Sequence, residues 1–132
     1  MTKPLVVLDQ VEKRFDDFVA VRDANLTIEE GEFIAIMGPS GCGKTTTLRM
    51  LAGLDAPTRG TISIAGQVMN DIPAHARDTP MVWQSLALFP FLNARENVEF
   101  GLKMHGVSAD ERRKRAVHLL DRMEISEFSE RN

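Results

Sequence analysis

The sequence has 132 residues, of which 43% are hydrophobic, so it is long enough for one domain with a core and too short for two domains of typical size. The formal net charge of -3 excludes non-specific attraction to nucleic acid or to an anionic membrane surface as the main activity. No run approaches the roughly 18 apolar residues of a membrane span, so we expect no direct membrane insertion. A single cysteine is typical of a reducing compartment, and the expected location is the cytoplasm.

Several segments predict β structure. Residues 5–11 and 18–28 are predicted to be strands, with turn-forming aspartates between them. Residues 61–68 predict a small hairpin that turns at an alanine and a glycine, and residues 81–83 predict a further short strand. These segments place β structure on both sides of the first predicted helix.

A strand, a loop and a helix follow one another in the first half of the chain. Residues 32–37 form a short apolar run of the kind found in a fully buried strand. Residues 46–52 contain good helix formers and stop at Gly53, a suitable C-terminal cap. The segment between them therefore leads from a predicted buried strand into a predicted helix.

This intervening loop is rich in glycine. Its residues are Gly38, Pro39, Ser40, Gly41, Cys42, Gly43, Lys44 and Thr45. Glycines let backbone amides converge on a polyphosphate, and the positive end of the following helix faces the same anion. Lys44 can then reach the β and γ phosphates, and the Thr45 hydroxyl can ligate magnesium. The loop predicts binding of ATP with Mg²⁺, and the alternative is a flexible glycine turn with an exposed lysine.

The last part of the chain is predicted to be helical. Asn93 with Glu96, and Ser108 with Glu111, have the spacing of capping boxes that begin helices. Gly106 separates the two predicted helices. We therefore expect the helical part of the chain to begin just after position 92.

Beyond the loop, several motifs resemble the ATP-binding subunits of ABC transporters over essentially the whole chain. They are Val11-Glu12-Lys13-Arg14-Phe15, the loop and helix from Gly38 to Gly53, Thr58-Arg59-Gly60-Thr61-Ile62, and Met81-Val82-Trp83-Gln84-Ser85. The resemblance implies an α/β fold, namely an incomplete ABC-type nucleotide-binding domain of the P-loop NTPase class. Residues 1–92 would hold an antiparallel β subdomain and the P-loop core, and residues 93–132 the start of a helical subdomain.

The resemblance also implies roles for single residues. Phe15 would stack on adenine, and its alternative role is that of an ordinary hydrophobic residue at a strand end. Gln84 would touch magnesium and the attacking water, and the alternative is a surface glutamine without a function. Lys44 would be catalytic with Gln84, and Thr46 would join the phosphate loop in binding the nucleotide.

The partners implied by the resemblance are a transmembrane permease subunit and a second ATPase subunit, which would dimerise with this one around two ATP molecules. The permease would dock near the segment from Gln84 to Leu92, which is strongly apolar but contains a proline. Burial of this segment in the domain's own core remains an equal alternative. The subunit would lie at the inner face of the cell membrane, and residues 78–101 resemble importers of polyamines, sugars and related solutes, although the sequence does not identify the solute.

Other elements of such an ATPase are absent from the sequence. An apolar strand that ends in Asp-Glu, the signature Leu-Ser-Gly-Gly-Gln and the later switch histidine do not occur. Residues 5–9 and 117–121 imitate the acidic strand end, but the first precedes the loop and the second lies in a predicted helix. We therefore expect the N-terminal part of a longer subunit, which binds ATP better than it hydrolyses it. A non-hydrolysing nucleotide-sensing module of the same fold is the alternative.

Overall fold

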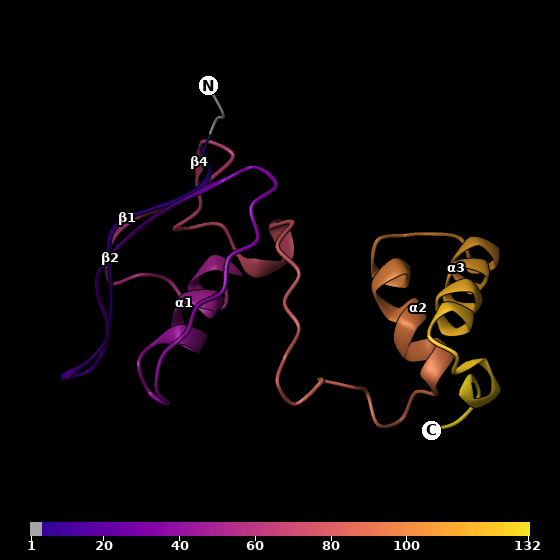
Figure 1. Cartoon of the computed structure of the whole chain (residues 1–132). Coiled ribbons are helices and arrows are strands. Elements are labelled where there is room, and N and C mark those ends of the chain that lie inside the picture. The colour runs from indigo at the N-terminus through magenta and orange to yellow at the C-terminus, as the bar shows by residue number, and fades with distance from the viewer. Residues whose placement is uncertain (1–3) are drawn as a thin grey trace. The chain divides into compact units, whose positions relative to one another are not determined.

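The structure is a computed structural model that describes residues 4–132 (Figure 1). Its elements are β1 (Pro4–Phe15), β2 (Phe18–Glu29), α1 (Lys44–Leu51), β3 (Arg59–Ile64), β4 (Gln67–Val68), η1 (Ala74–Ala76), α2 (Ala94–Met104), α3 (Ala109–Arg122) and η2 (Ser126–Phe128). The chain divides into two compact units, Met1–Met81 and Val82–Asn132. Among the described residues, no helix has the length and apolar character needed to cross a membrane.

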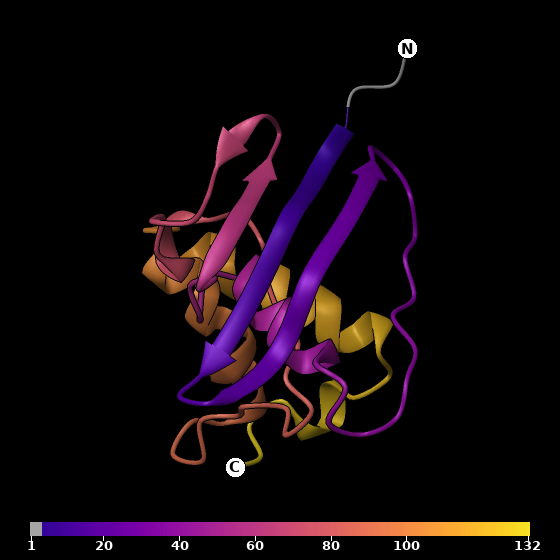
Figure 2. The same ribbon diagram turned by 90° about the vertical axis from the view of Figure 1, so that its left-hand side faces the viewer.

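The first unit contains one antiparallel sheet with the strand order β2-β1-β3-β4 (Figure 2). β1 and β2 form a hairpin that closes where Phe15 pairs with Phe18. β3 and β4 form a second hairpin, in which Ala65 and Gly66 both have positive φ angles, 51° and 80°. Positive φ at both central residues is typical of the tight turns whose twist matches antiparallel strands. The hairpin predicted at residues 61–68 is therefore confirmed, and so are the two strands predicted at residues 5–11 and 18–28.

The core of this unit lies between the sheet and α1. It contains the buried residues Leu8, Val11, Val21, Met50, Ile62 and Met69. Met50, from α1, is completely buried, and Val11 and Ile62 from the sheet are as well. α1 ends where predicted, because Gly53 adopts the left-handed conformation, with φ of 79°, just after the last turn.

The prediction of a buried strand at residues 32–37 is wrong. No strand forms there, and every residue of the segment is exposed, with Phe33 at 94% and Met37 at 89% of full exposure. A buried strand needs hydrogen-bonding neighbours on its edges, and no described strand pairs with this segment. The apolar pattern indicated that this segment favours burial, but it could not show whether a partner strand is available.

The strand predicted at residues 81–83 is also absent, and these residues have no regular secondary structure. Val82 is 89% exposed. A three-residue apolar run carries little information about structure, because it does not reveal whether a partner strand is available.

The second unit contains α2 and α3, which lie antiparallel about the turn at Gly106, where φ is 74° (Figure 1). At Asn93 the predicted capping box is confirmed, because its side chain accepts from the Glu96 amide at 2.8 Å and the Glu96 carboxylate accepts from the Asn93 amide at 3.0 Å. At Ser108 the helix begins as predicted, but the serine side chain makes no capping hydrogen bond. Residues 117–121 lie within α3, as expected.

Candidate functional site

The glycine-rich loop leads directly into α1 in the first unit. Gly41 and Gly43 have φ angles of 80° and 91°, which L side chains rarely adopt. The Cys42 amide donates to the Pro39 carbonyl at 3.3 Å, which closes a turn before the helix. The two left-handed glycines therefore reverse the chain so that it enters α1 from an exposed loop.

Gly43 fixes the start of α1 against strand β2. A Cβ atom at this position would lie 2.4 Å from the carbonyl oxygen of Ala20 and 3.1 Å from a methyl group of Val21. The Gly43 carbonyl in turn accepts from both the amide and the hydroxyl of Thr47, each at 2.9 Å. Only glycine satisfies both the positive φ and the close approach, so the first turn of α1 is anchored to the sheet.

Lys44 curls back over the loop that precedes it. Its ammonium donates to the carbonyls of Gly38 and Pro39, both at 2.7 Å, and lies 3.4 Å from the Cys42 sulfur. Gly38 also permits this compact arrangement, since a Cβ atom there would lie 2.7 Å from the same sulfur. The structure thus places the positive charge of Lys44 within the loop, and its contact with phosphates stays a prediction.

The start of α1 offers further groups suited to an anion and a cation. The amides of a helix's first turn have no acceptor within the helix, and the helix dipole makes this end positive. The first turn contains no acidic residue that would compete for these amides. Thr45 is exposed there, and Thr46 is half-buried. Amides, an ammonium and a free hydroxyl form a donor set that fits a triphosphate carrying magnesium.

Phe15 lies at the end of β1, in the same unit as the loop, and is 46% exposed. The Lys13 ammonium lies 4.9 Å from the centroid of the Phe15 ring, within the range of a cation–π contact. The same ammonium donates to the Ala56 carbonyl at 2.7 Å. The ring is therefore held at the surface by a neighbour that sequence analysis did not single out.

Gln84 lies in the second unit, at the start of a turn that spans residues 84–87, and it is exposed. Leu86 and Ala87 in this turn have positive φ angles of 64° and 51°. Positive φ is uncommon for such residues, so this turn is a strained segment of backbone.

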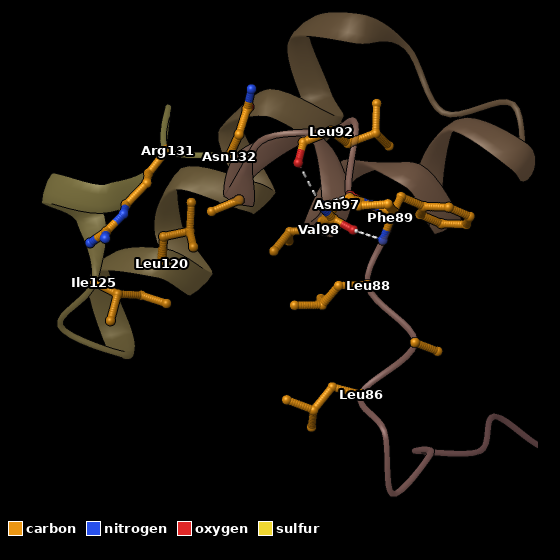
Figure 3. A pocket seen from close by; sticks show the side chains of 13 residues that line it. Leu86, Leu88, Phe89, Leu92, Asn97, Val98, Leu120, Ile125, Arg131 and Asn132 are labelled. Carbon is orange, nitrogen blue, oxygen red and sulfur yellow. Dashed lines mark hydrogen bonds between the residues drawn. The ribbon is translucent and has the colours of Figure 1, made fainter.

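The apolar segment after Gln84 lines a cavity of about 520 Å³ in the second unit (Figure 3). Leu86 and Leu88 are 68% and 66% exposed, whereas the Phe89 ring packs 4.3 Å from the ring of Phe100 on α2. Part of the segment is therefore packed in its own unit and part of it is exposed. Burial in the domain's own core therefore describes the Phe89 portion of the segment, and docking of the permease at the exposed leucines stays a prediction.

Asn97 of α2 holds this segment in place, and sequence analysis missed it. Its side chain accepts from the Phe89 amide at 2.9 Å and donates to the carbonyls of Phe89, Leu92 and Asn93 at 3.2, 3.0 and 3.0 Å (Figure 3). An asparagine inside a helix is an unfavourable choice unless its amide has partners elsewhere. An asparagine in the middle of a predicted helix was therefore the feature of the sequence that could have identified this contact.

Comparison with known proteins agrees with these features. The sequence profile of the family described as ABC transporter matches residues 21–132. The spermidine/putrescine import ATP-binding protein PotA of Rubrobacter xylanophilus is 48% identical over 130 residues, which are 98% of this chain and 34% of that protein. The Fe(3+) ions import ATP-binding protein FbpC 1 of Rhizobium meliloti is 52% identical over 111 residues, which are 84% of this chain and 31% of that protein. The chain thus spans about a third of the length of these curated relatives.

Solved structures show the same likeness. The dimeric structure of MJ0796, a bacterial ABC transporter cassette, has a TM-score of 0.83 at 35% identity, covering 96% of this chain and 60% of that one. The same cassette as a dimer in a post-hydrolysis state, bound to ADP and Pi, has a TM-score of 0.80 at 36% identity, with the same coverage. The phosphate loop, the fold and these likenesses agree: the chain belongs to the ABC transporter family.

Proposed function

We propose that this chain binds Mg²⁺-ATP as part of an ATPase subunit that couples ATP hydrolysis to solute import by an ABC transporter. The observation that carries the proposal is the anchored loop at the start of α1, in which Gly43 packs against β2 and Lys44 is held over the loop carbonyls. The names of the relatives, which are import ATP-binding proteins, support the importer assignment.

The residues of the loop have separable tasks in this proposal. Backbone amides from Gly38 to Thr46, except at Pro39, which has no N–H, donate to the phosphates, and the left-handed glycines keep Cβ atoms away from these amides. The Lys44 ammonium exchanges its two carbonyl acceptors for phosphate oxygens, which, being anionic, attract it more strongly. The Thr45 hydroxyl ligates the magnesium ion. ATP supplies the phosphoryl group, and these residues orient and neutralise it.

Two further assignments rest on the resemblance. Phe15 stacks on the adenine, which its exposure at the end of β1 permits. Gln84 contacts the magnesium ion and the attacking water, and its exposure in a strained turn is compatible with a segment that responds to the nucleotide. Both are proposals about the nucleotide-bound protein.

The partners in this proposal are a permease subunit and a second ATPase subunit. Residues 1–92 serve as the β subdomain with the P-loop core and residues 93–132 begin the helical subdomain. The permease docks near the exposed leucines between Gln84 and Leu92, so the subunit lies on the cytoplasmic face of the membrane. The relatives' names refer to polyamines in one case and to Fe(3+) ions in another at similar identity, so no solute is assigned.

Titration of the chain with Mg²⁺-ATP tests the proposal, because Trp83 is the only tryptophan and adjoins Gln84. Calorimetry gives the affinity, and Trp83 fluorescence reports on the neighbourhood of Gln84. We expect Lys44→Ala to weaken binding by roughly 10- to 100-fold, the range of a lost charge-assisted hydrogen-bond donor. Lys114→Ala, which removes the same charge from the exposed face of α3, is the control. Equal affinities for the two variants would contradict the proposal.

We also expect the 132-residue chain to show negligible steady ATP turnover, because these residues contain no signature sequence and no acidic strand end. Phosphate release under saturating Mg²⁺-ATP is the measurement. Sustained release that Lys44→Ala abolishes would show that this chain holds a complete catalytic centre.

A further inference from the structure

Arg77 forms a cluster of hydrogen bonds at the end of α1 opposite the phosphate loop. Its Nη1 donates to the carbonyls of Met50 and Leu51, the last two residues of the helix, at 2.9 and 3.0 Å. Its Nε donates to the Ile72 carbonyl at 2.7 Å, and its Nη2 donates to the Met69 carbonyl. One guanidinium therefore joins the C-terminal end of α1 to the segment that follows β4.

The chemistry of this cluster suits a helix C-terminus. The last carbonyls of a helix lack amide partners and form the negative end of the helix dipole, which a cation stabilises. Arg77 takes part in none of the ion pairs found between described residues, and all four of its acceptors are neutral backbone oxygens. Partial burial lowers the pKa of the Arg77 guanidinium from its ordinary value, yet arginine remains protonated at neutral pH. The positive charge of the Arg77 guanidinium therefore interacts with these four carbonyls.

Gly53 makes room for this guanidinium. A Cβ atom at position 53 would lie 2.6 Å from the Arg77 Nε atom, 2.9 Å from its Cζ atom and 3.0 Å from the Cα atom of Ala74. The helix therefore ends in a residue that both adopts the left-handed conformation and leaves space for the arginine. This agreement between two distant positions indicates a built contact rather than an incidental one.

α1 connects this contact to the phosphate loop. The helix has eight residues, about 12 Å at the usual rise, with Lys44 as its first residue and Leu51 as its last. So short a helix behaves as a rigid rod, so its direction is set by what holds its two ends. Gly43 against β2 holds the first end, and Arg77 holds the second.

We propose that Arg77 is a positioning residue of the nucleotide site: by fixing the C-terminal end of α1 it aims the amides, Lys44 and Thr45 at the opposite end toward the phosphates. The inference rests on the proposed function, because the direction of α1 matters for binding only if the start of this helix binds the phosphates. Arg77 itself donates to carbonyls of the protein and leaves the phosphates to the loop.

Substitution of Arg77 in the full chain tests this role. Arg77→Gln removes the charge, and Arg77→Lys keeps it but cannot reach four carbonyls. Arg59→Gln is the control, because it removes an exposed arginine from the same unit. Mg²⁺-ATP affinity by calorimetry, unfolding in urea and amide hydrogen exchange in peptides covering residues 44–54 are measured for each protein, and affinities are corrected for the folded fraction.

We expect Arg77→Gln to weaken Mg²⁺-ATP binding by about tenfold or more, Arg77→Lys to lose less, and Arg59→Gln to bind as the parent chain does. Exchange across residues 44–54 should be faster in Arg77→Gln than in Arg59→Gln. Unchanged affinity in a folded Arg77→Gln protein overturns the inference. If Arg77→Gln does not fold, unchanged affinity in Arg77→Lys overturns it.

The hydrogen-exchange measurement separates this inference from the proposed function. If the parent chain does not bind Mg²⁺-ATP, and its affinity is no higher than that of Lys44→Ala, the proposed function is contradicted. In that case, equal exchange across residues 44–54 in Arg77→Gln and Arg59→Gln overturns the role of Arg77 in fixing α1. Faster exchange confined to Arg77→Gln supports that role independently of any nucleotide.

Discussion

Two glycines of the phosphate loop share a backbone conformation but differ in their surroundings. Gly41 and Gly43 have φ angles of 80° and 91°. A Cβ atom at Gly41 would meet nothing within 4 Å, whereas one at Gly43 would lie 2.4 Å from the Ala20 carbonyl oxygen. A side chain at Gly41 would therefore cost only the energy of the left-handed conformation. A side chain at Gly43 would in addition force α1 away from β2.

Alanine at each position is therefore an informative comparison. We expect Gly41→Ala to lower the free energy of unfolding by about 1–2 kcal/mol, the cost of a left-handed L-residue. Gly43→Ala should lower it by clearly more, because backbone atoms must also shift. Urea unfolding of both variants is the measurement. Equal losses would show that the contact with Ala20 contributes nothing to stability.

Among single residues, sequence analysis singled out those that belong to one local motif. Lys44 and the loop glycines belong to one continuous motif, and their placement at the start of α1 is confirmed. Arg77 was missed because its partners are distant in sequence: it donates to carbonyls up to 27 positions away. Asn97 was missed although its partners lie only four to eight positions away, because most of them belong to an irregular segment that no sequence motif describes. A motif of consecutive residues cannot express such a contact.

At the level of whole elements, the two helices of the second unit begin with similar sequences but different caps. Asn93 is buried, and its side chain accepts from the Glu96 amide and donates to the Glu130 carboxylate at 3.0 Å. Ser108 makes no side-chain capping bond. The sequence pattern therefore located both helix starts but did not reveal which cap contributes stability.

Substitution of the two caps tests this difference. We expect Asn93→Ala to lower the free energy of unfolding by about 1–2 kcal/mol, since it removes the capping bond and a partner of Glu130. Ser108→Ala should change it by less than about 0.5 kcal/mol, as for a surface substitution without a contact. Urea unfolding followed by helical circular dichroism is the measurement, and a larger loss for Ser108→Ala would contradict the assignment.

At the scale of the whole molecule, carboxylates paired with arginine occur in both units. A hydrogen bond from Arg49 holds the pKa of Asp55 below its ordinary value, and a hydrogen bond from Arg95 does the same for the pKa of Glu130. In the folded protein these groups therefore stay ionised to lower pH than in the unfolded chain. Their contribution to stability is present above the unfolded pKa of about 4 and is lost as the pH falls through the lower folded pKa.

The expected outcome is a protein that loses stability below about pH 4 and loses less of it when Asp55 is replaced. Asp55→Asn removes the 2.7 Å ion pair with Arg49 at the end of α1. Asp71→Asn, which changes an exposed carboxylate of the same unit, is the control. Urea unfolding at pH 7 and at pH 3 measures the change, and an Asp55→Asn protein with the pH dependence of the parent chain would refute the assignment.

Local chain chemistry was sufficient for the turn of the glycine-rich loop, the β3–β4 hairpin, α1 and the starts of α2 and α3. Each depends on neighbours within a few positions, such as a glycine in the left-handed conformation or a cap three residues from its partner. Contacts between distant segments decided the rest. Such contacts pair β1 with β3 and bring Arg77 to the C-terminal end of α1. Residues 32–37 lack a partner strand among the described residues and are exposed. An apolar run records how much surface a segment would bury, but burial and strand pairing require a partner elsewhere in the chain, and only the folded structure shows which segments have one.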